Sequence, residues 1–182
     1  VIAAAKEIGK ARQSLAETIT MEMGKTINES RKEAEVCSTR LKFYADNAEK
    51  FLSQESIDTD AKNSYISFEP TGVVGVITPW NAPASQIAKA FSHVMAGNTV
   101  VIKPSSITPG TGLIIHDAVM SSGFPEGVFN IVIGKSNTGQ NMVESGVNGI
   151  AFTGSTETGR SIAEKAGSGI KKVVMELGGS DP

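Results

Sequence analysis

Hydrophobic residues recur at two different spacings along this chain, and the change of spacing divides it into zones. Up to about residue 52 they recur every three or four positions, which is the pattern of a helix with one buried face. The first such face comprises Ile8, Ala11, Leu15 and Ile19. These residues predict one long helix, which Gly24 can end. The next helical face comprises Ala34, Cys37, Leu41, Tyr44 and Ala48.

From Gly72 to Gly178 short apolar runs alternate with helical stretches. The runs are rich in valine and isoleucine, which favours strands; in order they are VVGVIT, TVVIKP, VFNIVIG, GIAFTG and KKVVME. The stretches between them are long enough to be the crossovers that parallel strands need. The alternation predicts an α/β fold with an open, parallel, five-stranded dinucleotide-binding sheet that has helices on both faces.

The zones also predict a domain organisation. We expect residues 1–57 to be the N-terminal helical part of a cofactor domain and residues 70–178 to be the dinucleotide-binding domain. Between them, residues 58–69 contain the alternating run SYISFE, which predicts an exposed edge strand that bridges to another segment or subunit. Residues 179–182 would begin a further domain. We therefore expect a piece of a longer protein, which forms a homo-oligomer (dimer or tetramer) when complete.

Composition narrows the choice of partners and compartment. The chain has 182 residues, 40% of them hydrophobic, and a net charge of −2, which favours neither nucleic acid nor a membrane as partner. A single cysteine, Cys37, rules out a disulfide within these residues and indicates a reducing, cytoplasmic location. The two histidines, His93 and His116, lack the spacing of metal ligands, so no metal site is predicted.

Polar, small or charged residues follow every predicted strand. In an open parallel sheet, ligands bind outside the carboxyl ends of the strands, so these residues predict a site at one edge. In strand order the segments are 78–81, 103–106, 134–136, 153–155 and 176–179.

The fourth of these segments opens a glycine-rich stretch, GSTETGRS, that runs from Gly154 to Ser161. Backbone N–H groups at such a helix start can hold an anion, and the spacing nearly matches a P-loop. Arg160, however, stands where a P-loop requires lysine. Close packing of helix and strand explains the glycines equally well. A P-loop-like nucleotide hydrolase with Glu176 near magnesium, and a non-catalytic nucleotide-binding module, therefore stay open as alternatives.

Several of these fragments, taken in order, resemble the aldehyde dehydrogenase superfamily. They are EMGKTINESRKEAE in the helical zone, then PWN, MAGNTVVIKPS, GFPEGVFNIVIG, FTGSTETG and ELGG. The resemblance covers most of the chain and implies the N-terminal, cofactor-binding part of an enzyme. That enzyme would use NAD or NADP to oxidise a small-molecule aldehyde to a carboxylic acid.

The resemblance also implies two catalytic residues. Asn81 matches the asparagine whose amide donates to the oxyanion that forms when a cysteine thiolate attacks the aldehyde. Glu176 matches the general base for hydrolysis of the resulting thioester. The alternative, purely structural roles are that Asn81 caps the following helix and that Glu176 caps a sheet edge. The family's nucleophile lies beyond ELGG, outside this chain, and the helical spacing of Cys37 predicts a buried hydrophobe instead.

The cofactor site follows from the same resemblance. Lys103 matches the lysine that contacts the adenosine ribose, and Ser106 stands where many NAD-preferring members have a glutamate. Because serine does not repel a 2′-phosphate, NADP is favoured over NAD. The other residues that the resemblance implies at the cofactor are Ile77, Thr78, Pro79, Trp80, Gly139, Gly154, Ser155, Leu177 and Gly178.

Overall fold

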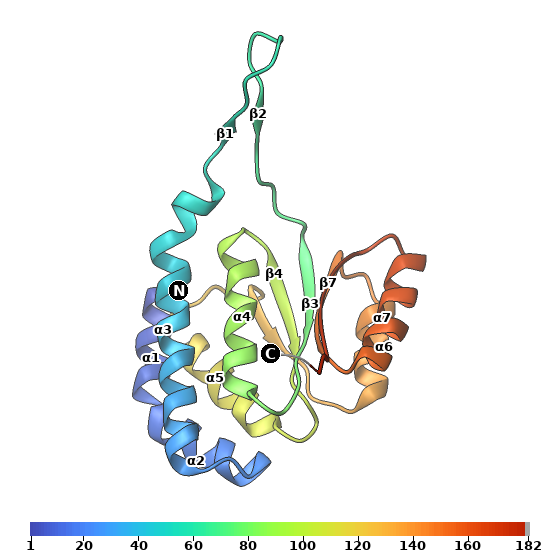
Figure 1. Ribbon diagram of the computed structural model, residues 1–182. Coiled ribbons are helices and arrows are strands. Elements are labelled where there is room, and N and C mark those ends of the chain that lie inside the picture. The colour runs from blue at the N-terminus through green and yellow to red at the C-terminus, as the bar shows by residue number, and fades with distance from the viewer. Residues whose placement is uncertain (181–182) are drawn as a thin grey trace.

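The computed structural model describes residues 1–180 and is built around a five-stranded sheet (Figure 1). Its strands lie in the order β5-β4-β3-β6-β7, and all neighbours are parallel. The strands are β3 (Val73–Ile77), β4 (Thr99–Lys103), β5 (Phe129–Ile131), β6 (Gly149–Gly154) and β7 (Lys172–Leu177). The predicted fold class is confirmed. Because the chain runs outward from β3 to β5 and then returns to β6, its direction reverses beside β3, where such sheets bind ligands.

Helices cover both faces of the sheet. On one face lie α4 (Pro83–Met95) and α5 (Pro109–Ser121), and on the other lie α6 (Ser136–Glu144) and α7 (Thr156–Ser168) (Figure 1). Side chains alternate along each strand, so Val74 and Val76 of β3 pack in the core with α4 and α5. Ile150 and Phe152 of β6 belong to the smaller core beneath α6 and α7.

Three N-terminal helices form an outer layer over α4 and α5. They are α1 (Ile2–Lys10), α2 (Arg12–Met23) and α3 (Ile27–Leu52), and α3 contacts α1, α2 and α4. The prediction of one helix before Gly24 is wrong, because the chain leaves helical geometry at Ala11 (φ −79°, ψ 3°). The break lets two short helices turn their buried faces onto α3. Gly24 ends α2 with a φ of +79°, as predicted.

The start of α5 is satisfied from this outer layer. Pro109 opens the helix, and no side chain of its own caps it. Glu22 of α2 accepts hydrogen bonds from the backbone N–H groups of Gly110 (2.6 Å) and Thr111 (3.0 Å), and from the Thr111 hydroxyl. A carboxylate from a different helix therefore acts as the N-cap and favours the positive end of the helix dipole.

A thin ribbon projects from the rest of the molecule (Figure 1). It consists of β1 (Glu55–Ser56) paired antiparallel with β2 (Tyr65–Ile66). The predicted edge strand thus pairs over only two residues, with a strand that the sequence did not predict. The side chains of Tyr65, Ile66 and Phe68 are exposed. Pairing of this ribbon with another subunit stays a prediction.

Two further predictions differ from the structure or extend past it. The seven-residue run VFNIVIG pairs only over Phe129–Ile131, because the chain turns away from β4 toward α6. The predicted start of a further domain, residues 179–182, falls partly outside the described residues. Within the described residues, no helix combines the length and apolarity needed to cross a membrane.

The close packing of α7 on β7 allows the packing role of the glycine-rich stretch to be tested. A Cβ atom added at Gly159 would collide with Cδ2 of the Leu177 side chain. Because Leu177 is 42% exposed and has to move aside, we expect Gly159→Ala to lose most or all of the roughly 1 kcal/mol that alanine gains over glycine inside a helix. Chemical denaturation of the chain measures this.

Gly167 of the same helix provides the matched control. A Cβ atom there meets nothing within 4 Å, so Gly167→Ala should stabilise the chain by up to about 1 kcal/mol. Equal effects of the two substitutions would contradict the packing role of Gly159.

Candidate functional site

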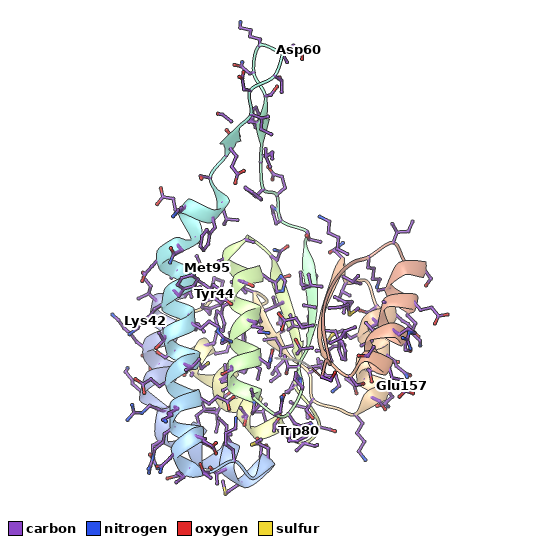
Figure 2. The ribbon with its side chains drawn as sticks, in the orientation of Figure 1. Lys42, Tyr44, Asp60, Trp80, Met95 and Glu157 are labelled. Carbon is purple, nitrogen blue, oxygen red and sulfur yellow. The ribbon has the colours of Figure 1, made fainter. Side chains whose placement is uncertain are left out.

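The turn after β3 lies at the centre of the carboxyl edge of the sheet. Ile77, the last residue of β3, is in register with Lys103 of β4 and Phe152 of β6. The backbone N–H of Thr78 continues this pairing with the Lys103 carbonyl at 3.1 Å. The chain then leaves the sheet, since the two prolines of the turn have no N–H to donate. Trp80 is 47% exposed at this edge (Figure 2).

One cavity of about 400 Å³ opens on the α6 and α7 side of this turn. It contains most of the predicted cofactor-binding residues: Ile77, Thr78, Pro79, Trp80, Lys103, Ser106, Gly139, Gly154 and Ser155. Lys135 and Lys165 line it as well, and within the described residues its wall has no aspartate or glutamate. The charge of this wall therefore suits an anionic ligand.

A second cavity of about 520 Å³ lies on the other side of the turn. The remaining predicted residues line it, namely Asn81, Glu176, Leu177 and Gly178. The two cavities share the walls formed by Pro79, Trp80, Thr153 and Gly154. The structure thus brings all the predicted site residues to two adjoining spaces at one edge of the sheet, while their individual roles stay predictions.

Lys103 is held in a desolvated position beside the first cavity. The residue is only 6% exposed, and its Nζ donates to the Pro104 carbonyl at 3.0 Å. Gly139 of α6 lies beside its stem, since a Cβ there would be in ordinary contact with the Lys103 Cδ at 3.5 Å. Burial lowers the pKa of Lys103, since it disfavours the charged form. An anion bound here would favour the ammonium form again.

The start of α7 is another anion-binding element of this cavity. Ser155 is the N-cap: its Oγ accepts from the Thr158 N–H at 3.3 Å and bonds to the Thr158 hydroxyl. Both residues line the cavity, so the positive end of the helix dipole faces it. Arg160 is exposed and lines neither cavity, which counts against the P-loop-like alternative.

The side chain of Asn81 is free to act as a donor. Within residues 1–180 it makes no hydrogen bond, and it does not cap α4, whose N-cap is Ala82. Glu33 of α3 accepts from the first free N–H groups of α4 in its place. The alternative that Asn81 serves as a helix cap therefore has no support in the geometry.

Glu176 approaches the same cavity from β7. It points to the face of the sheet that carries α4, where its carboxylate pairs with the Lys89 ammonium. Both side chains are partly exposed, so the pair contributes little to stability. The partner of Glu176 is therefore a lysine of α4 that lies outside the lining of this cavity, which differs from the sheet-edge cap considered for this residue.

Comparison with known proteins decides the family. A sequence profile described as the aldehyde dehydrogenase family matches residues 1–182. The chain belongs to the aldehyde dehydrogenase family. It is 39% identical over 181 residues to a probable NADP(+) succinate-semialdehyde dehydrogenase of Synechocystis, covering 98% of this chain and 40% of that protein. It is 38% identical to a betaine aldehyde dehydrogenase of Bacillus subtilis, covering 100% of this chain and 38% of that protein.

The fold agrees with solved members of the aldehyde dehydrogenase family. The crystal structure of a Streptococcus pyogenes succinic semialdehyde dehydrogenase, in complex with NADP+, superposes with a TM-score of 0.93 at 32% identity. The match covers 99% of this chain and 40% of that one. This chain therefore spans about 40% of the length of the relatives that it matches.

Sequence reasoning missed several residues in or beside the candidate site. Lys89 had a usable signal, since it is a lysine on a mostly apolar helix that follows PWN. Lys135 belongs to the predicted strand-end segment 134–136 but was not singled out as a site residue, and it lines the first cavity. Lys25 and Glu33 gave no local signal, because their contacts span more than 50 residues.

The cysteine within this part of the enzyme is inert by position. Cys37 is fully buried, and burial together with the nearby Glu33 carboxylate raises the pKa of its thiol to about 12. His93 is partly buried, and desolvation lowers its pKa. Among residues 1–180 there is no cluster of three or more potential metal ligands.

The inert character of Cys37 can be tested by alkylation. Since the thiolate is the reactive form, we expect the folded chain to resist iodoacetamide at pH 8, where a free thiol with a pKa of about 8.5 reacts readily. In denaturant the same residue should be alkylated fully, as mass spectrometry can establish. Rapid alkylation of the folded chain would mean that Cys37 is accessible and ionised.

Proposed function

We propose that this chain supplies the cofactor site, the oxyanion donor and the general base of an NAD(P)-dependent aldehyde dehydrogenase. The observation that carries the proposal is the pair of adjoining cavities. One is lined by lysines and helix N-termini, and the other by Asn81 and Glu176, with Trp80 in the wall between them. In this proposal the cysteine nucleophile lies outside the 182 residues.

The residues divide the reaction between them. Asn81 donates its amide N–H to the oxyanion that forms when a thiolate adds to the aldehyde, and it does so as a neutral, fixed donor. A nicotinamide cofactor held by the first cavity would supply the hydride acceptor for the adduct that Asn81 stabilises, which leaves a thioester. Glu176 then takes a proton from the water that hydrolyses the thioester. To accept that proton, its carboxylate must either bind the water while it stays paired with Lys89 or break the ion pair.

We propose NADP as the preferred cofactor. The first cavity is lined by Lys103, Lys135 and Lys165, and its described wall has no acidic residue. Lys165 is already paired with Glu144 of α6, so the attraction for a 2′-phosphate would come mainly from Lys103 and Lys135. The buried ammonium of Lys103 lacks an anionic partner among these residues, and a phosphate would offset its desolvation. The NADP+ complex of the related S. pyogenes enzyme is consistent with this preference.

We propose a small aldehyde as the substrate and do not single out one aldehyde. The relatives named above act on succinate semialdehyde and betaine aldehyde, which differ in charge. We further propose a cytoplasmic homo-oligomer; the exposed Tyr65, Ile66 and Phe68 of the ribbon support a contact there between subunits.

Asn81→Ala in the complete enzyme tests the proposed reaction. Loss of one oxyanion donor should lower kcat by about 10²–10³ with little change in cofactor affinity. The rate of hydride transfer, followed as cofactor reduction in a single turnover, is the measurement. Glu176→Gln provides the contrast, since it should spare that first turnover and block release of the acid. A normal hydride-transfer rate in Asn81→Ala would overturn the proposed role and favour a non-catalytic module.

Ser106→Glu tests the cofactor proposal. The new carboxylate would repel a 2′-phosphate and accept a hydrogen bond from a free 2′-hydroxyl. We expect the ratio of NADP to NAD dissociation constants to rise by at least about tenfold, or about 1.4 kcal/mol. Ser106→Gln, equal in size but uncharged, is the control, and ionic strength is held fixed because salt screens the contact. Equal ratios in the two variants would place this loop away from the ribose.

A further inference from the structure

The start of α4 depends on one buried carboxylate from the outer layer. Glu33 of α3 is 7% exposed, and its Oε1 accepts from the backbone N–H groups of Ala84 at 2.9 Å and Ser85 at 3.2 Å. The helix has no side-chain cap of its own, because Ala82 holds the N-cap position and Pro83 follows it. Glu33 thus fixes the first turn of the helix that follows Asn81 directly.

The same carboxylate also holds a lysine against the main chain of Asn81. Lys25 pairs through Nζ with Oε2 of Glu33 and donates to the Asn81 carbonyl oxygen at 3.0 Å. The backbone of Lys25 is itself anchored on both sides. Gly24 precedes it in a left-handed conformation, and Thr26 follows it as the N-cap of α3, in a reciprocal pair of hydrogen bonds with Glu29.

We infer that Lys25 and Glu33 are positioning residues that fix the main chain of Asn81 and thereby aim its side-chain amide. The inference rests on the proposed oxyanion role of Asn81. Glu33 sets where α4 begins, and Lys25 holds the carbonyl of Asn81 from outside the sheet. Neither side chain lines either of the two cavities described above, so both act through Asn81.

Loss of these contacts should lower the reaction rate, because they determine where the Asn81 amide points. The Asn81 amide makes no hydrogen bond within the described residues, so its direction depends on the backbone that carries it. Displacements of about 1 Å at a reacting group can cost about 10²-fold in rate. Removal of Lys25 would also leave Glu33 as a buried charge without its cation, which favours movement of the α4 start.

Glu22 separates this role from ordinary helix capping. It caps α5 in the same way that Glu33 caps α4, at the second and third residues of a helix that begins with proline. Within residues 1–180, however, no lysine joins Glu22 to the preceding loop in an ion pair. Glu22→Gln therefore disturbs a cap beside the Ser106 loop, and its main effect should fall on cofactor affinity.

A double-mutant cycle in the complete enzyme tests the inference. We expect Lys25→Met to slow single-turnover hydride transfer by at least about tenfold, while the cofactor dissociation constant changes by less than about twofold. In an Asn81→Ala background the same substitution should have almost no further effect, because the residue on which it acts is absent. Lys25→Arg, which keeps the charge and several N–H donors, should recover most of the rate. Lys10→Met, at an exposed pair on α1, is the control and should leave the rate unchanged.

The possible results separate the inference from the proposed function. A normal rate in Lys25→Met, or an equal loss with and without Asn81, overturns the positioning role alone. A normal rate in Asn81→Ala overturns the proposed function, and the inference with it. If Lys25→Met fails to fold, Glu33→Gln takes its place, since it keeps an acceptor for α4 and removes only the charge that holds Lys25. The same criteria apply to that variant.

Discussion

The N–H groups at the starts of α4 and α5 have to be satisfied, and much of the molecule is arranged around that requirement. Both helices begin with proline and lack a cap of their own, so carboxylates must come from elsewhere. Glu22 and Glu33 supply them from the outer helical layer. The layer that at first suggests a separate helical part is therefore tied to the loops at the carboxyl edge of the sheet. The candidate site depends on these contacts as much as on the strands.

Alternation along the strands explains why the site has two compartments. Ile77 and Lys103 point to the face with α6 and α7, where the cationic cavity lies. Glu176, one residue out of phase with Leu177, points to the opposite face and meets Lys89. In the proposed function, cofactor binding and acid–base chemistry therefore occupy opposite faces of one sheet, and the turn with Trp80 joins them.

The strands could be predicted from the sequence more fully than the long-range contacts that hold the candidate site in place. Short apolar runs predicted the five parallel strands, because periodicity is a local property, and strand ends located the predicted site residues at one edge. The break at Ala11 escaped prediction, since alanine favours helix and only packing on α3 explains the change. The contacts that Lys25 and Glu33 make with the start of α4 join distant segments, and nothing in the local pattern encodes them.

The central place of β3 has a consequence for how the molecule opens. Its backbone is hydrogen-bonded to β4 on one side and β6 on the other, so its amides belong to the part of the structure that exchanges with solvent only on near-global unfolding. The turn with Asn81 is joined directly to that strand. The β1–β2 ribbon, with two paired residues on each strand, lies at the opposite extreme and can fray freely. Thermal opening can therefore begin at the ribbon, far from Asn81, while β3 still holds one end of the turn.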